Sequence, residues 1–366
     1  MVPVVGRGGV ITTNVSISHF DLVAVIAQGI VDLDAVDHVE AFTMPYPRTV
    51  QLGLDRLGLQ CLLAGHAGPT GIPDLVRWAW SRQLSEWPLQ LDSEFVSSGD
   101  LLVDPLSRRP TKLCAAWAWE YSDDAPFEHA RDFLRTLVER GTPAVLTKAI
   151  QHLIDTPVIV TKQKATMAAK PGIGGLWHVM TDFYRRAPEW YFRGDRAATC
   201  ARCGELAIPV GKADWWCPWD ARPGDTTTTG EELDRDQGVW QLDGALTSYF
   251  AVSGRRAGAI RDRLAEAQVT EVRLSLEEGP WLEVTVPSGE TWCVRVDDRY
   301  QPGLTALAAR RTTAQSGARY PVLAVPDAWA QDARLGTLRH LIGSDMAVLT
   351  DSELIKTATG KAGTDA

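Results

Sequence analysis

The order of helical and strand-type patterns after residue 239 limits the fold more than any other feature of this sequence. Helical segments keep apolar residues on one face, as Ile260 and Leu264 show, whereas strand segments alternate, as Val272 and Leu274 show. The predicted elements are a helix at 255–268, strands at 269–277, 281–286 and 291–298, a helix at 302–317, a strand at 320–327, a helix at 329–343 and a strand at 346–351. This order, αβββαβ followed by αβ, predicts a layered domain whose last strands pair at least partly in parallel.

The N-terminal half has helical patterns throughout and no catalytic motif. Pro73 suits the first turn of a helix, and Gly141 suits the residue that ends one. Helices are predicted at 20–33, 49–63, 72–87, 127–141, 143–157 and 176–190. We therefore expect a helical accessory or interaction domain over residues 1–195.

Charge and hydropathy exclude several classes of protein. The 366 residues carry a net charge of -9, so any nucleic-acid contact must use a local patch rather than the whole surface. No segment has the roughly 18 consecutive apolar residues that a membrane span needs. The first residues include one arginine and no long apolar run, unlike a signal peptide. These features predict a cytoplasmic protein without membrane contacts.

Tryptophan is unusually frequent, with 14 residues, several of them in near-pairs. Trp117 and Trp119 lie in the helical half, and Trp215, Trp216 and Trp219 lie close to cysteines. Large aromatic side chains most often anchor cores and interfaces, and this is the favoured interpretation here. Stacking on nucleic-acid bases is the alternative.

Three cysteines form a cluster with metal-ligand spacing. Cys200-x-x-Cys203 is followed by a glycine that allows a tight turn, and Cys217-x-x-Asp220 has the spacing of a second knuckle. Zinc accepts cysteine sulfur and carboxylate oxygen in tetrahedral sites, and a small segment gains much of its folding free energy from such a metal. A structural Zn²⁺ on Cys200, Cys203 and Cys217, with Asp220 as fourth ligand, is one interpretation. A degenerate knuckle packed by tryptophans is the other.

The third strand, within "GETWCVRVDD" at 289–298, occupies the position that carries catalytic residues in restriction-endonuclease-like folds. Such nucleases need carboxylates for Mg²⁺ and commonly an acid-x-lysine pair on this strand. Arg295 stands where the acid is expected, and Asp297 stands where the lysine is expected. Side chains two residues apart share one face of a strand, and arginine cannot ligate Mg²⁺.

Three interpretations of this strand remain open. Arg295 and Asp297 form an ion pair that replaces a lost active site; or Glu283, Asp297 and Asp298 still bind Mg²⁺ in a variant site; or the domain is an unrelated α/β fold. The resulting fold class is α+β. It comprises the helical domain at 1–195, a small zinc-knuckle-like insert with an exposed linker at 196–238, a restriction-endonuclease-like αβββαβ domain at 239–355 and a disordered tail at 356–366.

The chain as a whole resembles the restriction-endonuclease-like proteins that accompany a divergent prokaryotic Piwi (pPIWI-RE) and a DinG-type helicase in three-gene defence islands. The resemblance rests on "YPRTVQLGLDRL" in the helical half, on "WYFRGDRAATCARCG" leading into the cysteines, and on the segment from Trp292 to Leu304. It implies a nuclease-fold component of an anti-phage or anti-plasmid system, with Piwi-like and helicase partners. The family's acid and lysine are absent from the third strand, and "RRAGAI" at 255–260 lacks the family's glutamate, so nuclease activity does not carry over.

Three functional hypotheses follow. A catalytically degenerate pseudo-nuclease would bind nucleic acid or a partner; an active Mg²⁺-dependent DNA endonuclease would use the variant site; a structural module would bind proteins, including other copies of itself, through its helical half. Arginines are the candidate phosphate contacts of the first hypothesis. They are Arg255, Arg256, Arg261, Arg295, Arg310 and Arg311.

Overall fold

The structure is a computed structural model that describes nine stretches of the chain. They are residues 18–35, 46–121, 125–219, 222–269, 271–275, 281–297, 299–316, 320–331 and 333–360. Among these residues, no helix combines the length and the apolar character needed to cross a membrane. The described part is mixed helix and sheet, as the α+β class requires.

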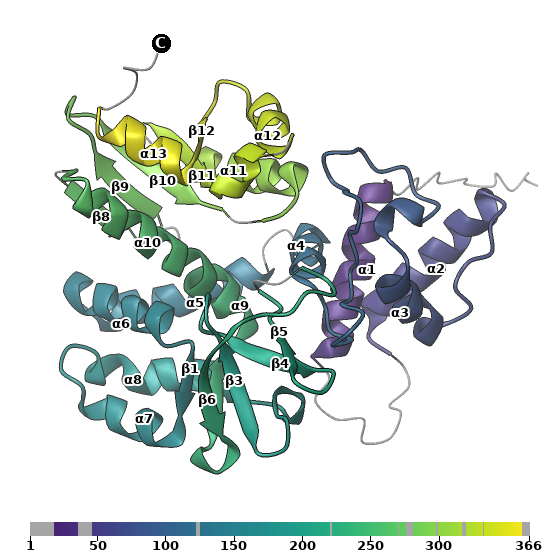
Figure 1. Ribbon diagram of the computed structural model, residues 1–366, viewed down its shortest axis with the longest axis horizontal. Helices are drawn as coiled ribbons and strands as arrows, with labels where there is room; N and C mark the ends of the chain where they lie inside the picture. Colours follow the sequence, from purple (N-terminus) through teal and green to yellow (C-terminus); the bar gives the residue numbers. More distant parts are fainter. Residues whose placement is uncertain are drawn as a thin grey trace, which may run out of the picture.

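Four helices at the N-terminus pack around one apolar core (Figure 1). They are α1 (His19–Asp34), α2 (Arg48–Leu63), α3 (Ile72–Ser81) and α4 (Lys112–Tyr121), with the 3-10 turn η1 (Leu84–Glu86) between the last two. Helix α1 begins at the Ser18 side chain, which accepts a hydrogen bond from Asp21 N at 3.0 Å. A Cβ atom on Gly29 would lie 2.5 Å from the Val50 Cα, so α1 and α2 approach closely only because that position is glycine.

A second helical group surrounds a small antiparallel sheet, ordered β1-β7-β2. Its helices are α5 (Ala125–Arg140), α6 (Pro143–Asp155), α7 (Thr161–Thr166) and α8 (Gly174–Met180), with 3-10 turns η2 (Met167–Ala169), η3 (Thr181–Phe183) and η4 (Glu189–Tyr191). Its strands are β1 (Val158–Val160), β2 (Tyr184–Arg186) and β7 (Val239–Leu242). The helix predicted at 176–190 is therefore wrong beyond Met180, because Tyr184 pairs with Leu242 and tertiary pairing overrides the local helical pattern.

The cysteine-rich region folds as an antiparallel sheet, ordered β5-β4-β3-β6. Its strands are β3 (Arg196–Cys200), β4 (Leu206–Val210), β5 (Asp214–Trp216) and β6 (Thr229–Asp234), and the turn η5 (Arg235–Gln237) follows. The exposed linker predicted at 220–238 is wrong for β6, which pairs with β3. Strand β6 resembles a linker in sequence because it is an edge strand whose only buried residue is Leu233.

The C-terminal domain has a five-stranded sheet with helices on both faces (Figure 1). Its elements are α9 (Gly244–Leu246), the π-helical turn η6 (Thr247–Val252), α10 (Ser253–Glu266), β8 (Glu271–Ser275), β9 (Trp281–Thr285), β10 (Thr291–Val296), α11 (Pro302–Ser316), β11 (Pro321–Val325), η7 (Asp327–Gln331), α12 (Arg334–Ile342), β12 (Ala347–Thr350) and α13 (Asp351–Ala358). The sheet order is β12-β11-β10-β9-β8. Strands β8, β9 and β10 pair antiparallel, whereas β10, β11 and β12 pair parallel, so the predicted order and partly parallel pairing are confirmed.

The predicted tail begins too early. Helix α13 extends to Ala358 and starts at a capping box, in which Thr350 and Glu353 satisfy each other's backbone amides. Leu354 and Ala358 are buried against the sheet. The segment resembles a tail because its other side chains are small or polar, and residues 361–366 lie outside the described part.

Polar and apolar contacts join the N-terminal helices to the C-terminal domain. The Asp100 carboxylate accepts hydrogen bonds from Ser97 N and from the Gln301 side-chain amide, and all of its surroundings are buried. Nearby, Gly303 lies against the ring of Phe95, where a Cβ atom would approach to 2.5 Å. Glu120 of α4 forms an ion pair with Arg311 of α11 at 2.6 Å.

We predict that Asp100→Asn changes the pH dependence of stability. Burial raises the pKa of Asp100 from 3.8 to about 6, against the opposing effects of its hydrogen bonds and of Arg334. The folded protein therefore binds this proton more tightly than the unfolded chain does, and the contribution of Asp100 to the free energy of unfolding falls as pH rises between these values.

Relative to Asp100→Asn, the wild type should lose up to roughly 3 kcal/mol between about pH 4 and about pH 7. Urea unfolding at several pH values measures this difference. Asp262→Asn, at a carboxylate that is 66% exposed, is the control and should follow the wild type. A gap between Asp100→Asn and wild type that stays constant with pH would contradict the prediction.

Candidate functional sites

Strand β10 presents one apolar face and one polar face. Trp292, Val294 and Val296 are buried in the core beneath α10. On the other face, Arg295 Nη2 lies 3.7 Å from Asp297 Oδ2, and the two side chains are only 15% and 5% exposed. Arg295 Nη1 also donates to the Ala308 carbonyl of α11 at 2.9 Å. The expected Arg295–Asp297 ion pair is present, and α11 holds it against the sheet.

The candidate carboxylates do not converge on one position. Glu283 is exposed and lies opposite Cys293 in the β9–β10 register. Asp297 is four residues beyond Cys293, which places its backbone about 13 Å further along the strand. Two ligands of one Mg²⁺ ion each lie only about 2.1 Å from it. Glu283 and Asp297 are thus too far apart to share an ion in this conformation, and Asp298 lies outside the described residues.

The end of β10 is fixed by Arg256 from α10. Its guanidinium forms an ion pair with Asp351 at 2.7 Å and donates to the Asp297 carbonyl at 2.8 Å. Burial raises the pKa of Asp351, and the charge of Arg256 opposes that increase. Arg256 is only 17% exposed, so its role here is structural.

The other candidate arginines also have partners within the chain. Arg255 donates to the Ile154 and Asp155 carbonyls at the end of α6, and Arg310 donates to the Leu341 carbonyl. Arg311 pairs with Glu120, and Arg261 pairs with its neighbour Asp262 at 2.9 Å. Of the six candidates, Arg261, Arg310 and Arg311 keep the most solvent-accessible surface for a phosphate contact.

The three clustered cysteines meet in space. Cys200 ends β3, Cys203 lies in the turn after it, and Cys217 follows β5. Their sulfur atoms all lie within 4.8 Å of one another, and no other group of three or more His, Cys, Asp or Glu side chains in the described residues does so. Cys203 Sγ and Cys217 Sγ are 3.3 Å apart. Gly204, at φ +69°, allows the turn that brings Cys203 under the cluster.

The donor set fits a structural zinc ion. Zinc–sulfur bonds of about 2.3 Å place tetrahedral sulfurs about 3.8 Å apart, within the range seen here. The Cys203 and Cys217 thiols interact with the Cys200 sulfur, which lowers the pKa of Cys200 and raises the pKa of the other two. Asp220, the predicted fourth ligand, lies outside the described residues.

A buried carboxyl beside the cluster also favours a cation there. Glu205 is 3% exposed, and its Oε1 has no hydrogen-bond partner in the described part of the chain. Burial raises the pKa of Glu205 to about 8; Arg255 opposes the increase, and the charge on Cys200 adds to it. A cation held by the sulfurs would favour the ionised form of this carboxyl.

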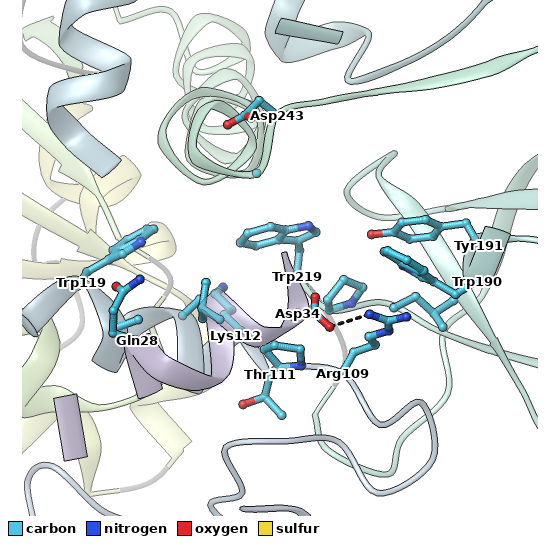
Figure 2. Close-up of a pocket in the computed structure, with 17 residues that line it drawn as sticks. Gln28, Asp34, Arg109, Thr111, Lys112, Trp119, Trp190, Tyr191, Trp219 and Asp243 are labelled. Carbon is cyan, nitrogen blue, oxygen red and sulfur yellow. Dashed lines mark hydrogen bonds and ion pairs between the residues drawn. The ribbon is translucent and has the colours of Figure 1, made fainter. Parts of the chain in front are cut away.

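A cavity of about 400 Å³ lies where α1 and α4 meet the cysteine-rich sheet and α9 (Figure 2). Its wall includes three tryptophans, Trp119, Trp190 and Trp219, from three separate parts of the chain. Arg109 forms an ion pair with Asp34 at 2.6 Å, and its guanidinium lies 3.8 Å from the centre of the Trp190 ring. Burial raises the pKa of Asp34, whereas Arg109 lowers it. The sequence indicated this cavity only through its excess of tryptophan.

We predict that Arg295→Met lowers the free energy of unfolding by about 3 kcal/mol, because it leaves the buried Asp297 carboxylate without its cation. Adding Asp297→Asn to that variant should restore part of the loss. Urea unfolding of the two single variants and the double variant measures the coupling. As a control, Arg261→Met, whose partner is exposed, should change stability by no more than about 0.5 kcal/mol. An Arg295→Met variant as stable as wild type would refute a structural role for the pair.

Comparison with known proteins identifies the N-terminal part of the chain. Residues 22–160 match the family model described as pPIWI_RE three-gene island domain Y. No curated protein and no solved structure matches the chain. The matched stretch runs from α1 to the end of β1 and includes the "YPRTVQLGLDRL" segment. The match of residues 22–160 to domain Y supports the association of this chain with pPIWI-RE three-gene islands.

Proposed function

We propose that the chain is a nuclease-fold component of a prokaryotic anti-invader defence island, and that it binds nucleic acid or a partner without cleaving it. The observation that carries this proposal is the buried Arg295–Asp297 ion pair on β10. The family resemblance places an acid and a lysine on this strand. A cation and an anion that neutralise each other under α11 leave no open ligand for Mg²⁺ at these two positions.

The arrangement of the C-terminal domain is consistent with a restriction-endonuclease-like core. Helix α10 precedes three antiparallel strands, and α11 leads into a strand parallel to β10. The polar face of β10 lies on the side of the sheet that α11 covers. An active site built on Glu283 and Asp297 would require these carboxylates to move together by many ångströms.

The association with pPIWI-RE islands favours partners encoded by the same islands. We infer that a Piwi-like protein and a DinG-type helicase are the partners, because both belong to the three-gene arrangement that the chain resembles. A purely structural interaction module is the second candidate. Three exposed leucines at the end of α2 favour it, since clustered apolar side chains on a surface mark interaction sites; they are Leu59, Leu62 and Leu63, which are 56%, 76% and 73% exposed.

We expect the purified chain to bind DNA without cutting it in Mg²⁺ or Mn²⁺. A labelled duplex and a labelled single strand serve as substrates, and fluorescence anisotropy measures binding. Affinity should fall roughly tenfold or more between about 50 mM and about 200 mM salt, because phosphate contacts release counterions. Arg261→Gln combined with Arg310→Gln should weaken binding, whereas Arg196→Gln, at a 64% exposed arginine on β3, should not.

Metal-dependent cleavage by the wild type that disappears in Asp297→Asn would refute the degenerate site. Absence of DNA binding at low salt would instead leave the interaction module as the function.

We propose in addition that the cysteine cluster holds a structural Zn²⁺. The purified chain should contain about one zinc ion, measured by plasma mass spectrometry, and a chelator should lower its melting temperature because metal binding contributes folding free energy. Cys200→Ser and Cys217→Ser should each lose the metal. Cys61→Ser, at a buried cysteine of α2, is the matched control and should retain it. Equal zinc content in all of these variants would exclude the cluster as the site.

A further inference from the structure

The cavity between domain Y and the cysteine-rich sheet has the size of a small-ligand site. Ligand pockets commonly measure about 300–1,000 Å³, are lined mainly by apolar and aromatic groups, and contain a few polar ones. This cavity, at about 400 Å³, falls at the lower end of that range. It could enclose a mononucleotide but not a folded peptide segment.

The aromatic groups of the cavity are exposed to it rather than packed in a core. Trp119 comes from α4, Trp190 and Tyr191 from η4, and Trp219 from the segment after Cys217. All four are only partly buried. Figure 2 shows Trp119 and Trp219 on either side of Lys112, with Trp190 and Tyr191 at the other end. Partly exposed indole rings that meet at a hollow provide surfaces on which a flat heterocycle can stack.

The charges in the wall decide between two classes of flat or cationic ligand. Cages of aromatic rings can also bind quaternary ammonium groups. Lys112 and Arg109, however, both carry positive charge in this wall. Arg109 is held in place by Asp34 and by the Trp190 ring, so its position is fixed before a ligand arrives. A ligand with an aromatic base and an anionic group therefore suits the cavity better than a cation does.

We propose that this cavity binds a nucleoside phosphate, with the base against the Trp119 and Trp219 rings and the phosphate beside Lys112. The ligand is either a free nucleotide or an unpaired nucleotide of a single strand. Every side chain that carries the proposal lies before residue 220, so it is independent of the proposed role of the β10 strand. The ligand would also contact two parts of the chain at once, domain Y and the sheet that contains the cysteines.

Isothermal titration of the full chain with AMP and with adenosine tests the proposal. AMP should bind at low salt, and Trp119→Ala or Trp219→Ala should weaken it by at least about fivefold, the lower limit for loss of one stacking contact. Trp215→Ala is the matched control, because Trp215 is a partly buried tryptophan of the same sheet outside the cavity, and it should bind AMP like wild type. Lys112→Gln should remove the advantage of AMP over adenosine.

Two further measurements separate loss of the site from loss of the fold. Trp219 packs against the cysteines, and the Arg299 guanidinium lies 4.9 Å from the centre of the Trp119 ring, so truncation could disturb either neighbourhood. Trp119→Phe and Trp219→Phe retain a stacking ring and should recover most of the affinity. Thermal melting should show each variant folded.

A labelled single strand identifies the source of the ligand. If AMP competes with the strand and both weaken in Trp119→Ala, the cavity accepts free nucleotides as well as strands. If only the strand binds and Trp119→Ala weakens it, the ligand is an unpaired base within a strand. Binding of AMP or strand that is unchanged in both folded alanine variants overturns the proposal, and so does failure of both to bind at low salt.

Discussion

A carboxylate buried at the end of β10 requires neutralisation in place, and the C-terminal domain is arranged around that requirement. Asp297 is 6% exposed, and an uncompensated charge in such a position is strongly destabilising. Arg295 compensates the side chain, and Arg256 binds the backbone carbonyl of the same residue while pairing with Asp351. These contacts connect α10, β10, α11 and α13, so the helices on both faces of the sheet meet at this single residue.

This use of charge also explains how an acidic protein can contain so many arginines without a basic surface. Guanidinium groups that donate to carbonyls at helix ends, as Arg255 and Arg310 do, satisfy backbone groups that a helix leaves unpaired. Arginine suits this role because its planar group offers several donors in fixed directions. A count of arginines therefore overestimates the surface available to phosphate, and only the partly exposed ones remain candidates.

Much of the fold follows from the sequence, and the exceptions have common physical causes. The elements from α10 to β12 are predictable because each has a clear apolar period, and the cysteine cluster is predictable from its spacing. Strands β2 and β6 are not, because each is short and is stabilised by pairing with a distant strand. The cavity is also hidden, because Trp119 and Trp219 are a hundred residues apart and only the folded chain brings them to one wall.

Strand β7 connects the two halves of the chain in time as well as in space. It is the central strand of the β1-β7-β2 sheet, although its partners lie in the helical half and it precedes the C-terminal domain directly. During synthesis, β1 and β2 emerge first and have no common neighbour until residues 239–242 leave the ribosome. The second helical core should therefore close late, only after the whole cysteine-rich sheet has been made. A fragment ending at residue 238 would lack the strand that completes that core, whereas one ending after 243 would retain it.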